Sequence, residues 1–148
     1  MANHVRRQIR ERVATTLTGL TTTGSKVYQS RVYPLAANNL PGLLVYTTSE
    51  SSAPDVMGAQ PELERELNLV IEGYAKTASN LDDVLDLISK EVEIAMAADT
   101  TINSLAKDSY LSATEIELTG EGEQPIGIVT MSYTVQYRTA NNAPDVAL

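Results

Sequence analysis

The segment IGIVTMSYTVQYR, residues 126–138, has the clearest strand pattern in the chain and decides its fold. Apolar or aromatic side chains occupy every second position from Val129 onward, and hydroxyl or amide side chains fill the positions between them. A strand with this alternation has one buried face and one polar face. The apolar face comprises Val129, Met131, Tyr133, Val135 and Tyr137. We therefore expect a sheet that carries its core on one face.

Four other segments have strand character, because they are rich in β-branched and aromatic residues or alternate in polarity: residues 27–33, 43–48, 64–74 and 111–118. The last of them is separated from residues 126–138 by a turn with two glycines at 120–125. That spacing predicts an antiparallel hairpin. Every link between strands except the helical crossover can be antiparallel.

Two segments have the period of an amphipathic helix. In residues 3–18, apolar side chains recur every four positions, with Asn3 placed to cap the start and Gly19 to follow the end. In residues 81–98 a core stripe begins at Leu81, after Ser79 and Asn80 as capping residues. A second apolar strip on this helix comprises Leu87, Ile94 and Ala98. We expect it to wedge between the sheet and the first helix; a subunit contact is the alternative.

The predicted order is helix, three strands, helix, two strands. This order favours the α+β class: one domain over residues 1–148, with a mostly antiparallel sheet and two helices packed on one face. Polar composition without pattern predicts loose ends at about residues 1–3 and 139–148, and a long loop at residues 49–61. We find no repeat and no second domain in the sequence.

Charge is distributed unevenly along the 148 residues, whose net charge is −8. Residues 1–49 carry six Lys or Arg against Glu11, a balance of +5, whereas residues 50–123 balance to −13. A basic end and an acidic body suit head-to-tail packing of identical copies. A solvated acidic surface with an arginine-rich first helix is the equally weighted alternative.

Several kinds of chemistry lack their usual residues. The chain has no cysteine and a single histidine, His4, so thiol catalysis and histidine-based metal sites are excluded. The acids are expected on water-facing sides of helices and turns, which argues against a catalytic carboxylate pair. We therefore expect no enzyme activity, no cofactor and no metal. We also expect no membrane association, since no apolar run approaches the length of a bilayer span.

The arginines of the first helix are Arg6, Arg7, Arg10 and Arg12. They go around the helix and are not accompanied by Trp or Phe, so a nucleic-acid reading surface is not expected. An acidic chain can still tolerate DNA nearby, because like charge prevents adhesion.

A family resemblance rests on the order of five segments: VYQSRVYPL (27–35), LPGLLVYT (40–47), ERELNLVIEGY (64–74), LDDVLDLI (81–88) and VTMSYTVQYR (129–138). In element order and length, residues 3–138 resemble the tail terminator proteins of lambda-type long-tailed bacteriophages, also called minor tail or tail-to-head joining proteins. The fold implied by the resemblance is a small α+β domain with a sheet and two helices.

The resemblance implies a structural virion protein at the head-tail junction, assembled in the host cytoplasm. Such proteins form a hexameric ring that caps the completed tail tube, ends tube polymerisation and offers its other face to the head connector or completion protein. Double-stranded DNA then passes through the ring without specific binding. The implied partners are copies of the chain itself, the tail tube protein and the head connector.

We identify six candidate subunit or partner contacts: Arg6, Arg7, Arg10, Arg12, Leu87 and Ile94. The loop at residues 49–61 is expected to become ordered on the tube. Two alternatives stay open: another neck or tail component, such as a head-completion or tail tube protein, and a small ligand-binding domain.

Overall fold

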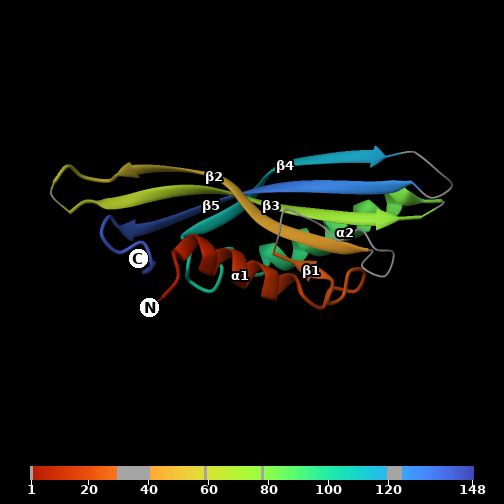
Figure 1. The fold of residues 1–148 in the computed structure, drawn as a ribbon, viewed down its shortest axis with the longest axis horizontal. Coiled ribbons are helices and arrows are strands. Elements are labelled where there is room, and N and C mark those ends of the chain that lie inside the picture. Colours follow the sequence, from red (N-terminus) through yellow and green to blue (C-terminus); the bar gives the residue numbers. More distant parts are fainter. Residues whose placement is uncertain (1, 30–40, 59, 78, 120–124) are drawn as a thin grey trace.

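The computed structural model describes residues 2–29, 41–58, 60–77, 79–119 and 125–148. Its elements follow the predicted order (Figure 1): α1 (Val5–Leu17), β1 (Val27–Tyr28), β2 (Gly42–Pro54), β3 (Glu62–Lys76), α2 (Leu81–Ala97), β4 (Asp108–Thr119) and β5 (Ile126–Ala140). The α+β class, with five strands and two helices, is confirmed. The later part of the expected strand at 27–33 and most of the turn at 120–125 lie outside the described residues.

The sheet has the strand order β1-β2-β3-β5-β4. β3 and β5 form its centre and pair antiparallel along their whole length, from Glu62 with Ala140 to Lys76 with Ile126. β4 and β5 form the expected antiparallel hairpin. One of the links that could be antiparallel is not, since β1 runs parallel to β2, with Val27 opposite Leu43. Apolar alternation carries no information about strand direction, so the sequence pattern could not distinguish the two arrangements.

Both helices cover the same face of the sheet (Figure 1). α1 lies over β1 and β2, while α2 lies over β3 and β5 and also contacts α1. Two glycines let α2 approach closely: a Cβ at Gly73 would lie 2.7 Å from Ile88 Cγ2, and one at Gly127 would lie 2.7 Å from Leu85 Cδ1. The core therefore forms one layer between the helices and the alternating apolar positions of the three long inner strands.

The predicted long loop at residues 49–61 was wrong. β2 continues through a bulge between Thr47 and Ser49 as far as Pro54, and it pairs with β3 throughout. Only the residues between Pro54 and Glu62 form the connection. The paired ends of β2 and β3 extend beyond α1 as a hairpin arm, at the left of Figure 1. Backbone pairing with β3 makes this polar segment a strand, although its side chains lack an apolar period.

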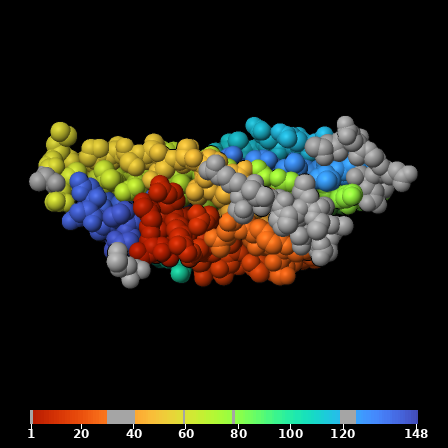
Figure 2. Space-filling view, in the orientation of Figure 1, coloured from red at the N-terminus to blue at the C-terminus, as the bar shows by residue number. Residues whose placement is uncertain are grey.

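The predicted loose end at residues 139–148 was also wrong. β5 continues to Ala140, Thr139 is fully buried, and the residues that follow fold back against α1 (Figure 2). The backbone N–H of Val5 donates to the carbonyl oxygen of Pro144 at 2.8 Å, and Gln8 Nε2 donates to the carbonyl of Asp145 at 3.0 Å. The tail thus satisfies a donor at the start of α1, a position where helices lack internal partners.

The helix caps differ in part from the expected ones. His4, rather than Asn3, caps α1, because its Nδ1 accepts the backbone N–H of Arg6 at 3.1 Å. Burial, followed by the charge of Arg6, lowers the pKa of His4, which favours the neutral ring needed for this acceptor role. Asn80 stands at the start of α2 without a side-chain capping bond. Gly19 follows α1 with a positive φ of 97°, as expected.

Candidate functional site

The four predicted arginines of α1 do not converge on one site. Arg6 Nη1 contacts Glu50 Oε2 of β2 at 3.0 Å, and Arg10 Nε donates to Gln29 Oε1 at 3.2 Å. Arg7 forms an exposed ion pair with Glu11, one turn along the helix, at 2.7 Å. Arg12 is exposed and forms no ion pair within the described part of the chain. The arginines therefore surround α1, with Arg6 committed to an internal contact.

Glu50 is the centre of a buried cluster that the sequence did not indicate. Its side chain is 7% exposed, and Oε2 also lies 3.1 Å from Arg65 Nη1 of β3. The Tyr137 hydroxyl donates to Oε1, and the guanidinium of Arg65 lies 5.9 Å from the centre of the Tyr137 ring. Arg65 Nε completes the cluster by donating to Thr139 Oγ1 at 3.1 Å. Residues from α1, β2, β3 and β5 thus meet at one carboxylate.

The electrostatics of this cluster favour a structural role. Both oxygens of Glu50 are occupied, and its charge faces two guanidinium groups, so the buried carboxylate is compensated. Burial, followed by the hydrogen bond to Glu50, raises the pKa of Tyr137 and keeps its hydroxyl protonated as a donor. The cluster anchors the first turn of α1 to the base of the hairpin arm.

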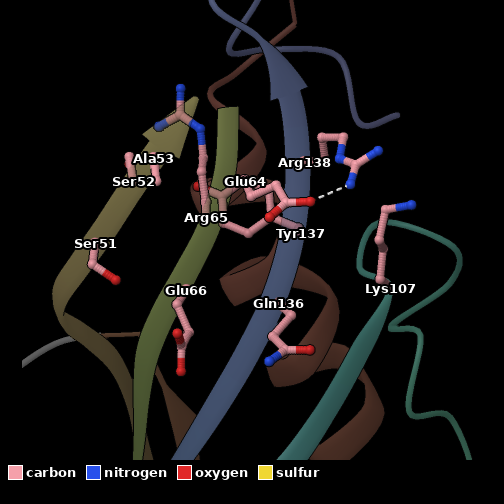
Figure 3. Close-up of a pocket in the computed structure, with 10 residues that line it drawn as sticks. All are labelled: Ser51, Ser52, Ala53, Glu64, Arg65, Glu66, Lys107, Gln136, Tyr137 and Arg138. Atoms are coloured by element: carbon pink, nitrogen blue, oxygen red, sulfur yellow. Dashed lines mark hydrogen bonds and ion pairs between the residues drawn. The ribbon is translucent and has the colours of Figure 1, made fainter. Parts of the chain in front are cut away.

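An open groove of about 320 Å³ lies where the arm leaves the body of the sheet (Figure 3). Ion pairs line part of it, since Arg138 contacts Glu64 and also lies 3.4 Å from Glu62 Oε2. Lys107 lies on the same side of the groove as Arg138, across from Ser51, Ser52 and Ala53 (Figure 3). The groove residues are Ser51, Ser52, Ala53, Glu64, Arg65, Glu66, Lys107, Gln136, Tyr137 and Arg138.

The face of the sheet opposite the helices is acidic and rich in hydroxyl groups. The strand registers place six glutamates there: Glu62, Glu64, Glu66, Glu72, Glu115 and Glu117. Hydroxyl side chains of β5 alternate between them, and the hydroxyls of Tyr46 and Tyr74 both donate to Glu72, the latter at 2.8 Å. Arg138 is the cation on this face of β5, and Glu64 already pairs with it. An anionic ligand would meet net negative charge on this face.

The second apolar strip of α2 does not pack inside the molecule. Leu87 is 45% exposed and Ile94 is 60% exposed, so the expected wedge between the sheet and α1 was wrong. The partly buried Val84 and Ala95 are the α2 residues that pack beside the core stripe. Leu87 and Ile94 are thus available to a partner, as the alternative interpretation required.

Other exposed apolar side chains gather at two places. Ile116 and Leu118 of β4 are 49% and 53% exposed, although both lie opposite buried or covered positions of β5. Val56 and Met57 lie at the tip of the hairpin arm, where Met57 is 93% exposed. The end of β4 and the tip of the hairpin arm lie at opposite ends of the sheet (Figure 1).

Membrane-spanning helices and metal sites are both absent from the residues described above. None of their helices has the length and hydropathy required to cross a membrane. They also contain no group of three or more histidine, cysteine, aspartate or glutamate side chains positioned to hold a metal ion.

Comparison with known proteins gives a distant structural likeness. The chain matches no protein-family model, and it matches no curated protein. Among solved structures, it is similar to a chain of the "Virion of native gene transfer agent (GTA) particle", with a TM-score of 0.42 and 12% sequence identity. The alignment covers 91% of this chain and 93% of that chain.

Proposed function

We propose that this protein is a structural component of a phage-type virion that caps the completed tail tube. In this role, copies of the chain form a closed ring, end the addition of tube subunits and present the opposite face of the ring to the head connector. The sequence resemblance to tail terminator proteins motivates the proposal. The protein would act at the head-tail junction by shape and charge, with no chemical transformation.

The observation that carries the proposal is the polar face of the sheet opposite the helices. Six glutamates and a row of hydroxyl side chains occupy this face, and two of those glutamates, Glu62 and Glu64, already pair with Arg138. DNA that passes such a surface is repelled by like charge and releases no counterions to it, so it does not adhere. This chemistry suits the wall of a channel for double-stranded DNA.

The separation of charge supports closure into a ring. The arginines of α1 and Lys26 lie on the β1–β2 side of the molecule, where α1 packs. The exposed acids of α2 and β4 lie on the other side. When one edge of a subunit is complementary to the opposite edge of the next, the contact is heterologous, and a suitable rotation closes it into a ring. Arg7, Arg10 and Arg12, together with Leu87 and Ile94, are the candidate contacts left after Arg6 is assigned to Glu50.

The decisive experiment mixes the purified protein with tail tube subunits during polymerisation. We expect tubes to stop growing and to carry one ring at one end in negative-stain images. A tube protein would instead polymerise alone, and a head-completion protein would leave tube growth unaffected while binding the head connector. Either of those results would contradict capping and favour the corresponding alternative.

Light scattering of the pure protein provides an independent measurement. We expect a mass several times that of the 16.0 kDa chain, and ring-shaped particles in images of the same sample. A monomer at high concentration that binds neither tube nor connector would exclude this function. A small ligand-binding domain, with the groove of Figure 3 as its site, would then become the better interpretation.

A further inference from the structure

β4 is an edge strand with an accessible backbone margin. It lies at one end of the strand order. Among the described strands, its only partner is β5, which lies on its inner side. Residues Ala113–Leu118 are exposed on both faces of the strand. Lys, Pro or a β-bulge usually prevents an edge strand from pairing with another chain. This stretch contains neither residue, and its one irregularity precedes it, between Leu111 and Ala113.

A second accessible margin lies on the opposite side of the sheet. β1 pairs with β2 only at Leu43 and Leu44, and the described part of the chain contains no strand on the outer side of Ser49–Ala53. These residues pair with β3 on their inner side. Pro54, which lacks a backbone N–H, follows this margin and ends it.

The directions of the strands make the two margins compatible. Each step from β2 to β3, to β5 and to β4 is antiparallel, so β4 runs opposite to β2. If identical copies in the same orientation lie side by side, β4 of one copy runs antiparallel to β2 of the next. Within one copy, the sheet register places Ala113 level with Tyr46, so pairing with Ser49–Ala53 requires neighbouring copies to be offset along the strands. The helices of both copies then stay on the same side of a continuous sheet.

Charge distinguishes this arrangement from pairing between two β4 strands. Glu115 and Glu117 would face their own copies across a β4–β4 contact, and like charges across strands are destabilising. On the other margin, the residues on the same face of the sheet as these glutamates are Ser49, Ser51 and Ala53, none of which is charged. Pairing with that margin therefore avoids the like charges that would face each other across a β4–β4 contact.

We propose that β4 of one copy pairs antiparallel with Ser49–Ala53 of the next copy, so that the sheet continues from subunit to subunit. This inference rests on the proposed ring. The exposed side chains of Ile116 and Leu118 lie on the helix-bearing face of β4. In the proposed pairing, α1 of the neighbouring copy would cover them. Main-chain hydrogen bonds would supply affinity. The uncharged side chains of Ser49, Ser51 and Ala53 would favour this margin over a second β4, which would bring glutamates together.

Engineered disulfides test the pairing directly, because the natural chain contains no cysteine. Ala113→Cys is combined in one chain with Ser49→Cys, Ser51→Cys or Ala53→Cys, whose side chains share one face of the sheet. Disulfide formation requires Cβ atoms about 3.5–4.5 Å apart, so only the correct register reacts quickly. We expect a ladder of covalent oligomers on mild oxidation for one or two of the three pairs. As a control, Met57→Cys with Ala113→Cys should give no ladder.

The outcomes separate this inference from the proposed function. A covalent dimer from Ala113→Cys alone would show β4–β4 pairing and overturn the inference. A ring-sized mass by light scattering and rings in negative-stain images, with no covalent oligomers for any of the three cysteine pairs, would also overturn the inference. That result would leave the capping function standing. A monomer in light scattering that also binds neither tube nor connector would remove both proposals.

A second variant disrupts the edge without adding a cross-link. Ile116→Lys with Leu118→Lys places cations on an exposed edge, a substitution that blocks strand addition. We expect the concentration for half-assembly to rise at least tenfold, with the thermal unfolding of the monomer unchanged. Val56→Lys with Met57→Lys, two exposed apolar residues at the arm tip, is the matched control and should leave assembly unchanged. Equal assembly in both variants would overturn the pairing.

Discussion

Glu50 illustrates how one side chain joins elements that are distant in sequence. Its carboxylate accepts from Arg6, 44 positions earlier, and from Tyr137, 87 positions later. The position lies in a polar stretch of β2, Ser49–Pro54, that has no apolar alternation. In a buried ion pair each charge is compensated by the other. The loss of the Glu50 carboxylate therefore leaves Arg65 as an uncompensated buried charge.

We predict that Glu50→Gln lowers the free energy of unfolding by about 3 kcal/mol, because Arg65 then keeps a buried charge without a counterion. Urea titration followed by circular dichroism measures the change. Glu66→Gln is the matched control, since Glu66 is exposed and lies on the opposite face of the sheet from the cluster, and it should change stability by less than about 0.5 kcal/mol. Equal effects in the two variants would contradict the structural role of the cluster.

Tyr133 and Tyr137 share a face of β5 but differ in their hydroxyl groups. The Tyr137 hydroxyl donates to Glu50, whereas the buried Tyr133 hydroxyl has no hydrogen-bond partner within the described residues. We predict that Tyr133→Phe leaves stability at pH 7 unchanged or raises it by up to about 1 kcal/mol. Tyr137→Phe should lower it by about 1–2 kcal/mol, since it strips a donor from a buried carboxylate. A larger loss for Tyr133→Phe would refute the assignment.

The same tyrosine predicts an alkaline loss of stability. Burial, followed by the charge of Glu93, raises the pKa of Tyr133 to about 12, compared with about 10 in an unfolded chain. The folded state therefore favours the protonated phenol, and the free energy of unfolding falls as the pH rises from 10 toward 12. Urea titrations across this window should show a smaller fall for Tyr133→Phe than for the natural chain. Parallel curves for the two proteins would contradict the raised pKa.

At the scale of elements, α2 depends on two glycines in the strands beneath it. A Cβ at Gly127 would also lie 3.0 Å from Leu81 Cγ, so the helix has no room to accept it without moving. We predict that Gly127→Ala costs about 1–3 kcal/mol, the usual penalty for overpacking a filled core. Chemical denaturation measures the loss. Gly58→Ala is the control, because no atom lies within 4 Å of its added Cβ; a comparable loss there would point to a general effect of alanine.

The elements differ in how well the sequence predicts them. β3, β5 and α2 were predicted because each buries one face of a regular apolar period. The outer half of β2 was missed because pairing with β3, and not its own composition, makes it a strand. The direction of β1 and the exposure of Leu87 and Ile94 depend on packing in three dimensions. A helical period identifies an apolar strip but does not say what covers it.

The candidate site was predicted in part, for a related reason. The α1 arginines are evident from composition, but their partners are not, since Glu50 and Arg65 reach Arg6 only after three elements pack together. The acidic face opposite the helices needed the strand registers as well as the alternation within each strand. Local patterns therefore assign faces, whereas the grouping of charges from several elements requires the fold.

At the scale of the whole molecule, the positive and negative edges are the main determinants of the proposed ring. We predict that Arg7→Glu with Arg10→Glu weakens ring formation or head joining, because it reverses the charge of the basic edge. Raising the salt from 0.05 to about 0.5 M should weaken assembly of the natural chain in the same direction, since exposed charges are screened. Sedimentation across this salt range measures both effects. Unchanged assembly and full infectivity of the variant would discard the arginine contacts.

The central pair of strands has a consequence for how the chain acquires its structure. β3 and β5 meet across separations of about fifty to eighty residues, so the core cannot form until a long loop has closed. Contacts of this range slow folding, typically to milliseconds or seconds. Until β5 arrives, the apolar face of the β2–β3 hairpin stays open to water, and newly made chains are at their most aggregation-prone. Expression at reduced temperature, or with chaperones, should raise the yield of correctly folded subunits.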